Sequence, residues 1–153
     1  MVSLGLIAFQ DFKERQVYWF YFPLIALLFA LLHFNLTANW GVFLYEIAIN
    51  WVLVTCIISI LYTYTKLVSK KEFLGHSIGL GDVLFFYAFA TGFPSISFMT
   101  LMVSAILFSL FTFLILKHRM KLKTVPLAGL MGLFLIFIVC YSLVFNNTLL
   151  YGI

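Results

Sequence analysis

Long apolar runs are the feature that most constrains what this chain can fold into. Four of them are nearly free of charge and approach or exceed the roughly 20 residues that a membrane-crossing helix needs. They cover Val17–Phe34, Val42–Leu67, Ser95–Leu116 and Leu127–Phe145, and two shorter apolar segments cover Met1–Gln10 and Ile78–Phe93. Only 9% of the 153 residues are charged and 65% are hydrophobic, so the surface helices of a water-soluble domain would lack polar faces. We therefore expect an all-α, polytopic membrane protein with a single membrane-embedded domain over residues 1–153.

The placement of Lys and Arg predicts the topology. If all six segments cross the membrane, the connections at 12–16, 68–77 and 117–126 lie on one side. That side then receives every basic residue, and positive charge collects on the cytoplasmic side of membrane proteins. We expect six transmembrane helices with both termini outside, and basic loops that contact anionic lipid headgroups rather than nucleic acid. The nine basic residues are Lys13, Arg15, Lys66, Lys70, Lys71, Lys117, Arg119, Lys121 and Lys123.

Two aspartates stand at the ends of apolar segments. Asp11 ends the first segment and Asp82 begins the fourth, so this topology places both at the cytoplasmic ends of their helices and at similar depth. A carboxylate at membrane depth is costly and indicates a functional site. Two carboxyls close together share a proton, so one can activate a water while the other polarises a carbonyl. The alternative is that each aspartate caps a helix end or pairs with a basic residue such as Lys13 or Arg15.

The residues before Asp82 favour the catalytic interpretation. Gly79-Leu80-Gly81-Asp82 opens a membrane helix directly after a polar loop. Glycines permit unusual backbone angles and close approach of another chain. We therefore expect Gly79 and Gly81 to bind an extended substrate backbone beside the carboxylate.

With these motifs, the chain resembles the prepilin and preflagellin peptidases, which are membrane aspartyl proteases of the Gly-x-Gly-Asp type. The resemblance rests on Asp11 with Arg15 four residues later, on Gly79-Leu80-Gly81-Asp82, and on Pro126 at the start of the last apolar run. It implies six transmembrane helices, with Asp11 and Asp82 as the catalytic pair and no metal or cofactor. It also implies a multi-pass endopeptidase of a prokaryotic cytoplasmic (inner) membrane, which removes the leader peptides of prepilin-like membrane proteins at the cytoplasmic face.

Two departures from the family pattern bear on substrate recognition. Val17-Tyr18-Trp19 stands where the family often has Ile-Pro-Asn, and Leu84 stands where a Lys commonly follows the second aspartate. The cysteine-bearing insert of the larger bifunctional members is also missing, so methyl transfer is not implied. Two other functions remain open on the residues alone: a proton- or cation-coupled transport protein, and a non-catalytic membrane assembly subunit.

The remaining polar residues and the cysteines do not predict a further site. The three histidines are scattered without the spacing of a metal site, and Glu46 lies near a helix end, where headgroup water can reach it. Cys56 and Cys140 fall inside apolar runs, so we expect small buried side chains rather than a disulfide. The histidines are His33, His76 and His118.

Overall fold

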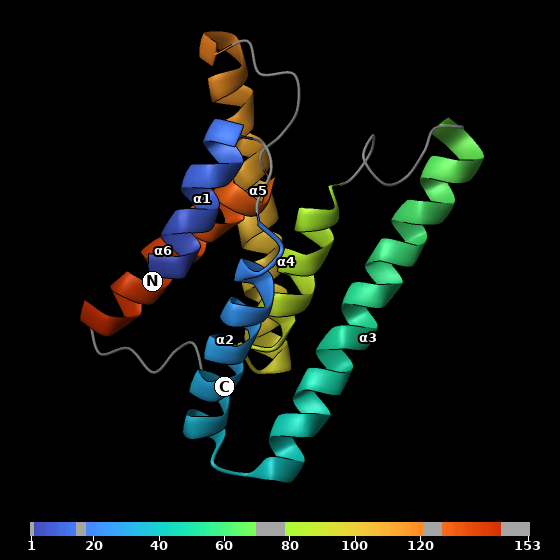
Figure 1. Cartoon of the computed structure of the whole chain (residues 1–153). Coiled ribbons are helices and arrows are strands. Elements are labelled where there is room, and N and C mark those ends of the chain that lie inside the picture. Colours follow the sequence, from blue (N-terminus) through green and yellow to red (C-terminus); the bar gives the residue numbers. More distant parts are fainter. Residues whose placement is uncertain (1, 15–17, 70–78, 121–126, 145–153) are drawn as a thin grey trace.

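The chain folds into helices only, within the residues that the structure describes. The computed structural model describes residues 2–14, 18–69, 79–120 and 127–144 and shows six α-helices there without a strand (Figure 1). This confirms the all-α prediction. The helices are α1 (Val2–Glu14), α2 (Tyr21–Thr37), α3 (Trp40–Tyr64), α4 (Leu80–Ala90), α5 (Ser95–Met120) and α6 (Leu127–Val144), and a π-helical turn, η1 (Thr65–Ser69), extends α3.

Most helix boundaries fall close to the ends of the apolar runs, and two differ in an informative way. The first apolar segment ends at Gln10, but α1 continues through Asp11 to Glu14, so Asp11 lies inside a helix rather than after it. The second run begins at Val17, but α2 begins at Tyr21. This start places Pro23 in the first turn. N–H groups there have no partner within the helix, so the N–H that proline lacks costs no helical hydrogen bond.

A tight turn joins α2 to α3. Ala38 has a positive φ of 51°, and its N–H donates to the carbonyl of Phe34. Asn39 then caps α3, because its side-chain oxygen accepts from the N–H groups of Gly41 and Val42. The two helices therefore form an antiparallel hairpin in which residues equally distant from the turn lie opposite one another.

Helix α4 is the centre of the bundle. It is only 11 residues long, about 16 Å, and it packs against α2, α3 and α6. Phe85 and Phe89 are completely buried, and the Phe89 ring lies within 6 Å of the rings of Phe93 and Phe98. These rings pack edge to face, an arrangement that aromatic side chains favour.

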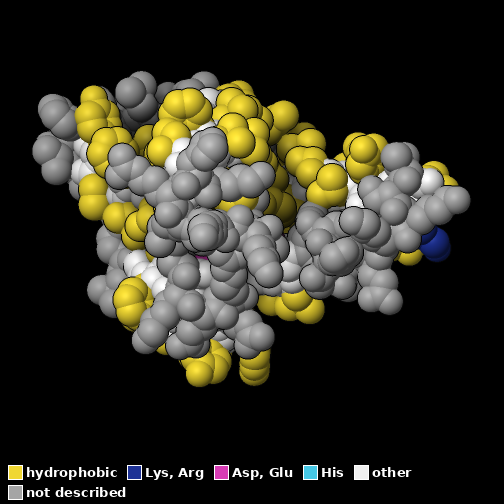
Figure 2. All heavy atoms as spheres, turned by 90° about the horizontal axis from the view of Figure 1, so that it is seen from above, with side chains coloured by type: hydrophobic (Ala, Val, Ile, Leu, Met, Phe, Trp, Pro, Cys, Tyr) yellow, Lys and Arg dark blue, Asp and Glu magenta, His cyan; other side chains and the backbone are white. Residues whose placement is uncertain are grey.

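The outer surface of the bundle is apolar, which favours a membrane location. Hydrophobic side chains are exposed along whole helices and dominate the described side chains in Figure 2. Two helical stretches, Trp40–Leu67 and Ser95–Leu116, are long and apolar enough to cross a bilayer. Only 11% of the first and 22% of the second is buried in the protein, unlike the core helix of a water-soluble domain. Helices α2, α4 and α6 are apolar but shorter than this test requires.

The prediction for the cysteines was wrong in one respect. Cys56 and Cys140 are free, but both are exposed on the bundle surface rather than buried. An apolar run does not distinguish the side of a helix that faces lipid from the side that faces protein, since both are apolar. Other predictions lie outside the described residues. These concern the connections at 70–78 and 121–126, Arg15, Val17, His76 and Pro126, and the side chains of Lys13, Lys117, His118 and Arg119.

Candidate functional site

The start of α6 is where the two aspartates meet. The first amides of a helix have no partner within the helix, and here side chains from two other helices supply acceptors. The N–H of Ala128 donates to Oδ1 of Asp82 at 2.9 Å, and the next N–H, that of Gly129, donates to Oδ2 of Asp11 at 2.6 Å. The structure therefore brings together α1 and α4 residues that the sequence placed at similar depth.

The geometry places the two carboxyl groups close enough to interact. Adjacent backbone nitrogens are only about 3 Å apart, so the two accepting oxygens lie within roughly 9 Å of each other at most. Like charges at this range oppose double ionisation, while the N–H groups and the positive end of the α6 dipole favour one negative charge.

Asp82 occupies the third position of α4, one turn above the Gly79 N-cap. Its carboxyl lies beside Gly79, as that of an acidic residue in the first turn of a helix commonly lies beside the N-cap. A Cβ on Gly79 would lie 3.3 Å from Oδ2 of Asp82, and a Cβ on Gly81 would lie 3.4 Å from the ring of Phe22. Gly79 has φ −72° and Gly81 shows no positive φ. Both glycines therefore provide space, for the carboxyl and for the core, without unusual backbone angles.

Gly129 allows Asp11 to approach α6. A Cβ on Gly129 would lie 2.9 Å from Oδ2 and 3.0 Å from Cβ of Asp11, and 3.4 Å from the carbonyl oxygen of Ala8. Real Cβ atoms essentially never show the first distance, and the second is tighter than nine in ten real Cβ contacts. Helices α1 and α6 form the most extensive pairing in the bundle, and the hydrogen bond to Asp11 depends on this close approach. This role of Gly129, which stands three residues after Pro126, was not predicted from the sequence.

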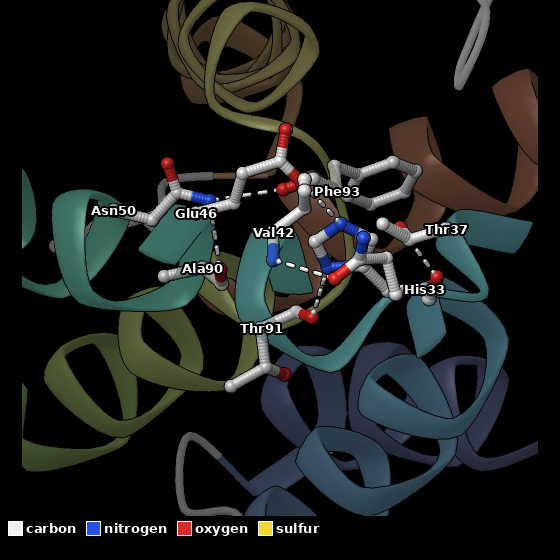
Figure 3. Close-up of polar contacts among 9 residues, drawn as sticks. His33, Thr37, Val42, Glu46, Asn50, Ala90, Thr91 and Phe93 are labelled. Atoms are coloured by element: carbon white, nitrogen blue, oxygen red, sulfur yellow. Dashed lines mark hydrogen bonds and ion pairs between the residues drawn. The ribbon is translucent and has the colours of Figure 1, made fainter. Parts of the chain in front are cut away.

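A second polar cluster lies at the opposite end of α4, and the sequence interpretation missed it (Figure 3). His33 is completely buried in α2, and its ring contacts the carbonyl of Thr91 and the carboxyl of Glu46. Asn50 is also completely buried and donates to the carbonyls of Ala90 and Phe93. The expectation that Glu46 simply faces headgroup water was incomplete, since it pairs with His33 across the α2–α3 hairpin.

These two clusters differ in what they can do chemically. Asp11 and Asp82 present two carboxyls at a helix end, an arrangement that can accept a proton from water and give one to a carbonyl. The second cluster satisfies the carbonyls at the end of α4 and in the turn that follows it. In the described part of the chain, no three His, Cys, Asp or Glu side chains gather as metal ligands.

No protein-family model matches the chain, and neither the curated proteins nor the solved structures contain a significant match. The functional assignment therefore depends on the residues and their geometry.

Proposed function

We propose that this protein is a membrane aspartyl endopeptidase that removes the leader peptides of prepilin-like proteins, with Asp11 and Asp82 as the catalytic pair. The observation that carries the proposal is the capture of both carboxyls by consecutive amides of α6. Residues 71 positions apart in the sequence converge on one helix end, and both are ionisable groups in a largely apolar bundle. Such groups are rare in membrane helices and mark functional sites.

The proposed reaction needs one carboxylate and one carboxylic acid. The carboxylate takes a proton from a water, whose oxygen bonds to the scissile carbonyl carbon, while the acid gives its proton to the carbonyl oxygen. The C–N bond of the resulting tetrahedral intermediate then breaks, and the leaving nitrogen receives the proton that the carboxylate took from water. One hydroxyl of the intermediate gives its proton back to the other aspartate as the new carboxyl group forms, so the pair again holds one proton. The N–H groups of Ala128 and Gly129 hold the carboxyls in place throughout and stabilise the negative charge that the pair carries.

The proposed setting is the cytoplasmic face of a prokaryotic inner membrane. All six helices cross the bilayer in this proposal, which places every Lys and Arg on the cytoplasmic side. The short helix α4 crosses within the bundle, where protein rather than lipid surrounds it. The substrate's apolar helix lies in the bilayer, and the bond beside its basic leader reaches Asp11 and Asp82. In this proposal an extended substrate backbone approaches the carboxyl of Asp82 at Gly79, whereas the expected substrate contact at Gly81 is not supported, because the Phe22 ring of the core lies against that glycine.

A cleavage assay with Asn variants tests this function. Asp11→Asn and Asp82→Asn retain an oxygen that accepts the α6 hydrogen bond but cannot act as acid or base. The purified protein in liposomes should cleave a prepilin-like substrate, and each variant should lose cleavage while its melting temperature stays close to that of the unmodified protein.

The same hydrogen bonds also cap α6, so the experiment must separate catalysis from capping. If the aspartates are only caps, the unmodified protein does not cleave, and Asp→Ala lowers stability more than Asp→Asn. If the protein is a transporter, the liposomes show a proton or cation flux that either Asn variant abolishes. Cleavage that survives in an Asn variant would also refute the proposed mechanism.

A further inference from the structure

His33 is bonded at both ring nitrogens inside an apolar bundle. Nδ1 lies 3.1 Å from the carbonyl oxygen of Thr91, and Nε2 lies 2.9 Å from Oε2 of Glu46 (Figure 3). The His33 side chain is completely buried, whereas the Glu46 side chain is 20% exposed. The proposed peptidase mechanism uses neither residue.

The hydrogen-bond partners fix how many protons this pair holds. The carbonyl oxygen of Thr91 can only accept, so Nδ1 carries a hydrogen. The contact between Nε2 and Oε2 also needs a hydrogen, because otherwise two lone pairs face each other at 2.9 Å. The pair is therefore either an imidazolium with a carboxylate or a neutral imidazole with a carboxylic acid. Both forms hold one proton more than a neutral imidazole beside a carboxylate.

Charge considerations favour the same proton count. The extra proton makes the pair neutral overall, and an uncompensated charge in an apolar interior is costly. Thr91 follows the last residue of α4, and the negative end of a helix dipole favours a cation beside it. Glu46 is the charged group in contact with the ring. The Phe43 ring from α3, at 5.3 Å, and Thr37 of α2, which donates to the His33 carbonyl, are neutral neighbours.

We propose that His33 and Glu46 form a proton-binding site that holds one proton between Nε2 and Oε2. The bound proton joins α2 and α3 to the turn between α4 and α5, which we name the α4–α5 turn (residues 91–94). Neighbouring hydrogen bonds reinforce this connection, because Asn50 donates to Ala90 and Phe93 and the Thr91 hydroxyl contacts the carbonyl of Ala26. Loss of the proton places the lone pairs of Nε2 and Oε2 in contact. The hydrogen bond between His33 and Glu46 then breaks, and the α4–α5 turn is no longer connected to α3 through His33. The partly exposed side of Glu46 provides the route by which the proton exchanges.

Nitrogen-15 NMR of the imidazole ring tests the proposal without reference to any catalytic activity. A variant with His76→Gln and His118→Gln leaves His33 as the only histidine, and it can be studied in lipid bilayers at neutral pH. Infrared spectroscopy of the same sample, with Glu46→Gln as the difference reference, reports whether Glu46 is a carboxylate or a carboxylic acid. Two results support the proposal: both nitrogens protonated beside a carboxylate, or an unprotonated Nε2 beside a carboxylic acid. An unprotonated Nε2 beside a carboxylate overturns it.

A matched substitution separates proton binding from simple packing. In Glu46→Gln the amide group can donate to Nε2, so the contact remains but the extra proton is no longer needed. The Nε2 signal should then appear in the unprotonated position while the Nδ1 signal stays protonated. If both nitrogens remain protonated in Glu46→Gln, the proton does not depend on Glu46 and the proposal is wrong. The spectrum of the single-histidine protein decides the question by itself if the Gln variant fails to fold.

Discussion

Gly129→Ala is the substitution that most sharply tests whether the position of Asp11 matters. The new Cβ would lie 2.9 Å from Oδ2 and 3.0 Å from Cβ of Asp11, whereas carbon atoms in contact are about 3.5–4.0 Å apart. Asp11 must therefore move by roughly 0.5–1 Å. Its 2.6 Å hydrogen bond from the Gly129 N–H lengthens or breaks as it moves.

The expected cost is larger for catalysis than for stability. Overpacking costs about 1–3 kcal/mol, but Ala improves the helix propensity of α6 by up to about 1 kcal/mol over Gly. The net loss of folding free energy is therefore roughly 0–2 kcal/mol. A misplacement of about 1 Å in a catalytic group can cost on the order of 100-fold in rate, which corresponds to about 2.7 kcal/mol. We expect cleavage to fall by about 100-fold in a protein that remains folded.

The chain offers a matched control one turn along the same interface. A Cβ on Gly132 would meet only the carbonyl oxygen of Leu4, at an ordinary 3.6 Å, so Gly132→Ala should keep full activity and gain slightly in stability. Cleavage rates and melting temperatures of both variants, measured in the same liposomes, complete the test. Equal activity of the two variants would show that Asp11 need not contact α6 during the reaction. An equal loss in both would indicate that general packing of α1 on α6 is responsible.

Three further outcomes follow from the structure. The cleavage rate should pass through a maximum as pH is varied, because the reaction needs one carboxyl of the pair ionised and the other protonated. A rate that only rises or only falls over the pH range in which the protein stays folded would contradict the proposal that Asp11 and Asp82 share a proton. Asn50→Ala should destabilise the protein by about 1–3 kcal/mol because it removes two buried hydrogen bonds, those to the carbonyls of Ala90 and Phe93. Thr55→Val, at an exposed site bonded to Tyr87, should cost less than about 1 kcal/mol. Equal free energies of unfolding for the two variants would show that the Asn50 hydrogen bonds do not stabilise the protein. In single-tryptophan variants, lipids brominated near the headgroup should quench the fluorescence of Trp40, and lipids brominated deep in the acyl chain should quench that of Trp51. The two residues are eleven positions apart in α3, which corresponds to about 16 Å along the helix. Equal quenching of both by aqueous iodide would argue against a membrane-crossing α3.

The helices were predictable from sequence because lipid imposes a simple rule on a spanning segment. The backbone must satisfy its own hydrogen bonds and the side chains must be apolar over a fixed length, so runs such as Ser95–Leu116 mark α5 within a few residues. The rule says less about segments shorter than that length. The end of α1 was therefore missed, because Gln10 and Asp11 look like the end of an apolar run although the helix continues.

The rotation of each helix was harder to predict, because apolar residues cover all its faces. That is why Cys56 and Cys140 were assigned to the interior, and why the pairing of His33 with Glu46 was missed. A usable signal for that pair did exist. The turn at Ala38 and Asn39 makes α2 and α3 antiparallel, and His33 and Glu46 lie at similar distances on either side of it. Polar residues placed in this way around a short turn can be predicted as neighbours once the turn itself is recognised.

The capping of α6 by two distant aspartates has a consequence for biosynthesis. Gly129 follows Asp11 by 118 residues, and a ribosome adds about 5–20 residues per second, so Asp11 exists for roughly 6–24 s before its partner amide is made. During that interval Asp11 and Asp82 are in the nascent chain without the helix end that holds them together. The site is thus assembled by α6, the helix of the six that is synthesised after all the others, and a nascent chain stalled before residue 127 contains both aspartates without the paired site.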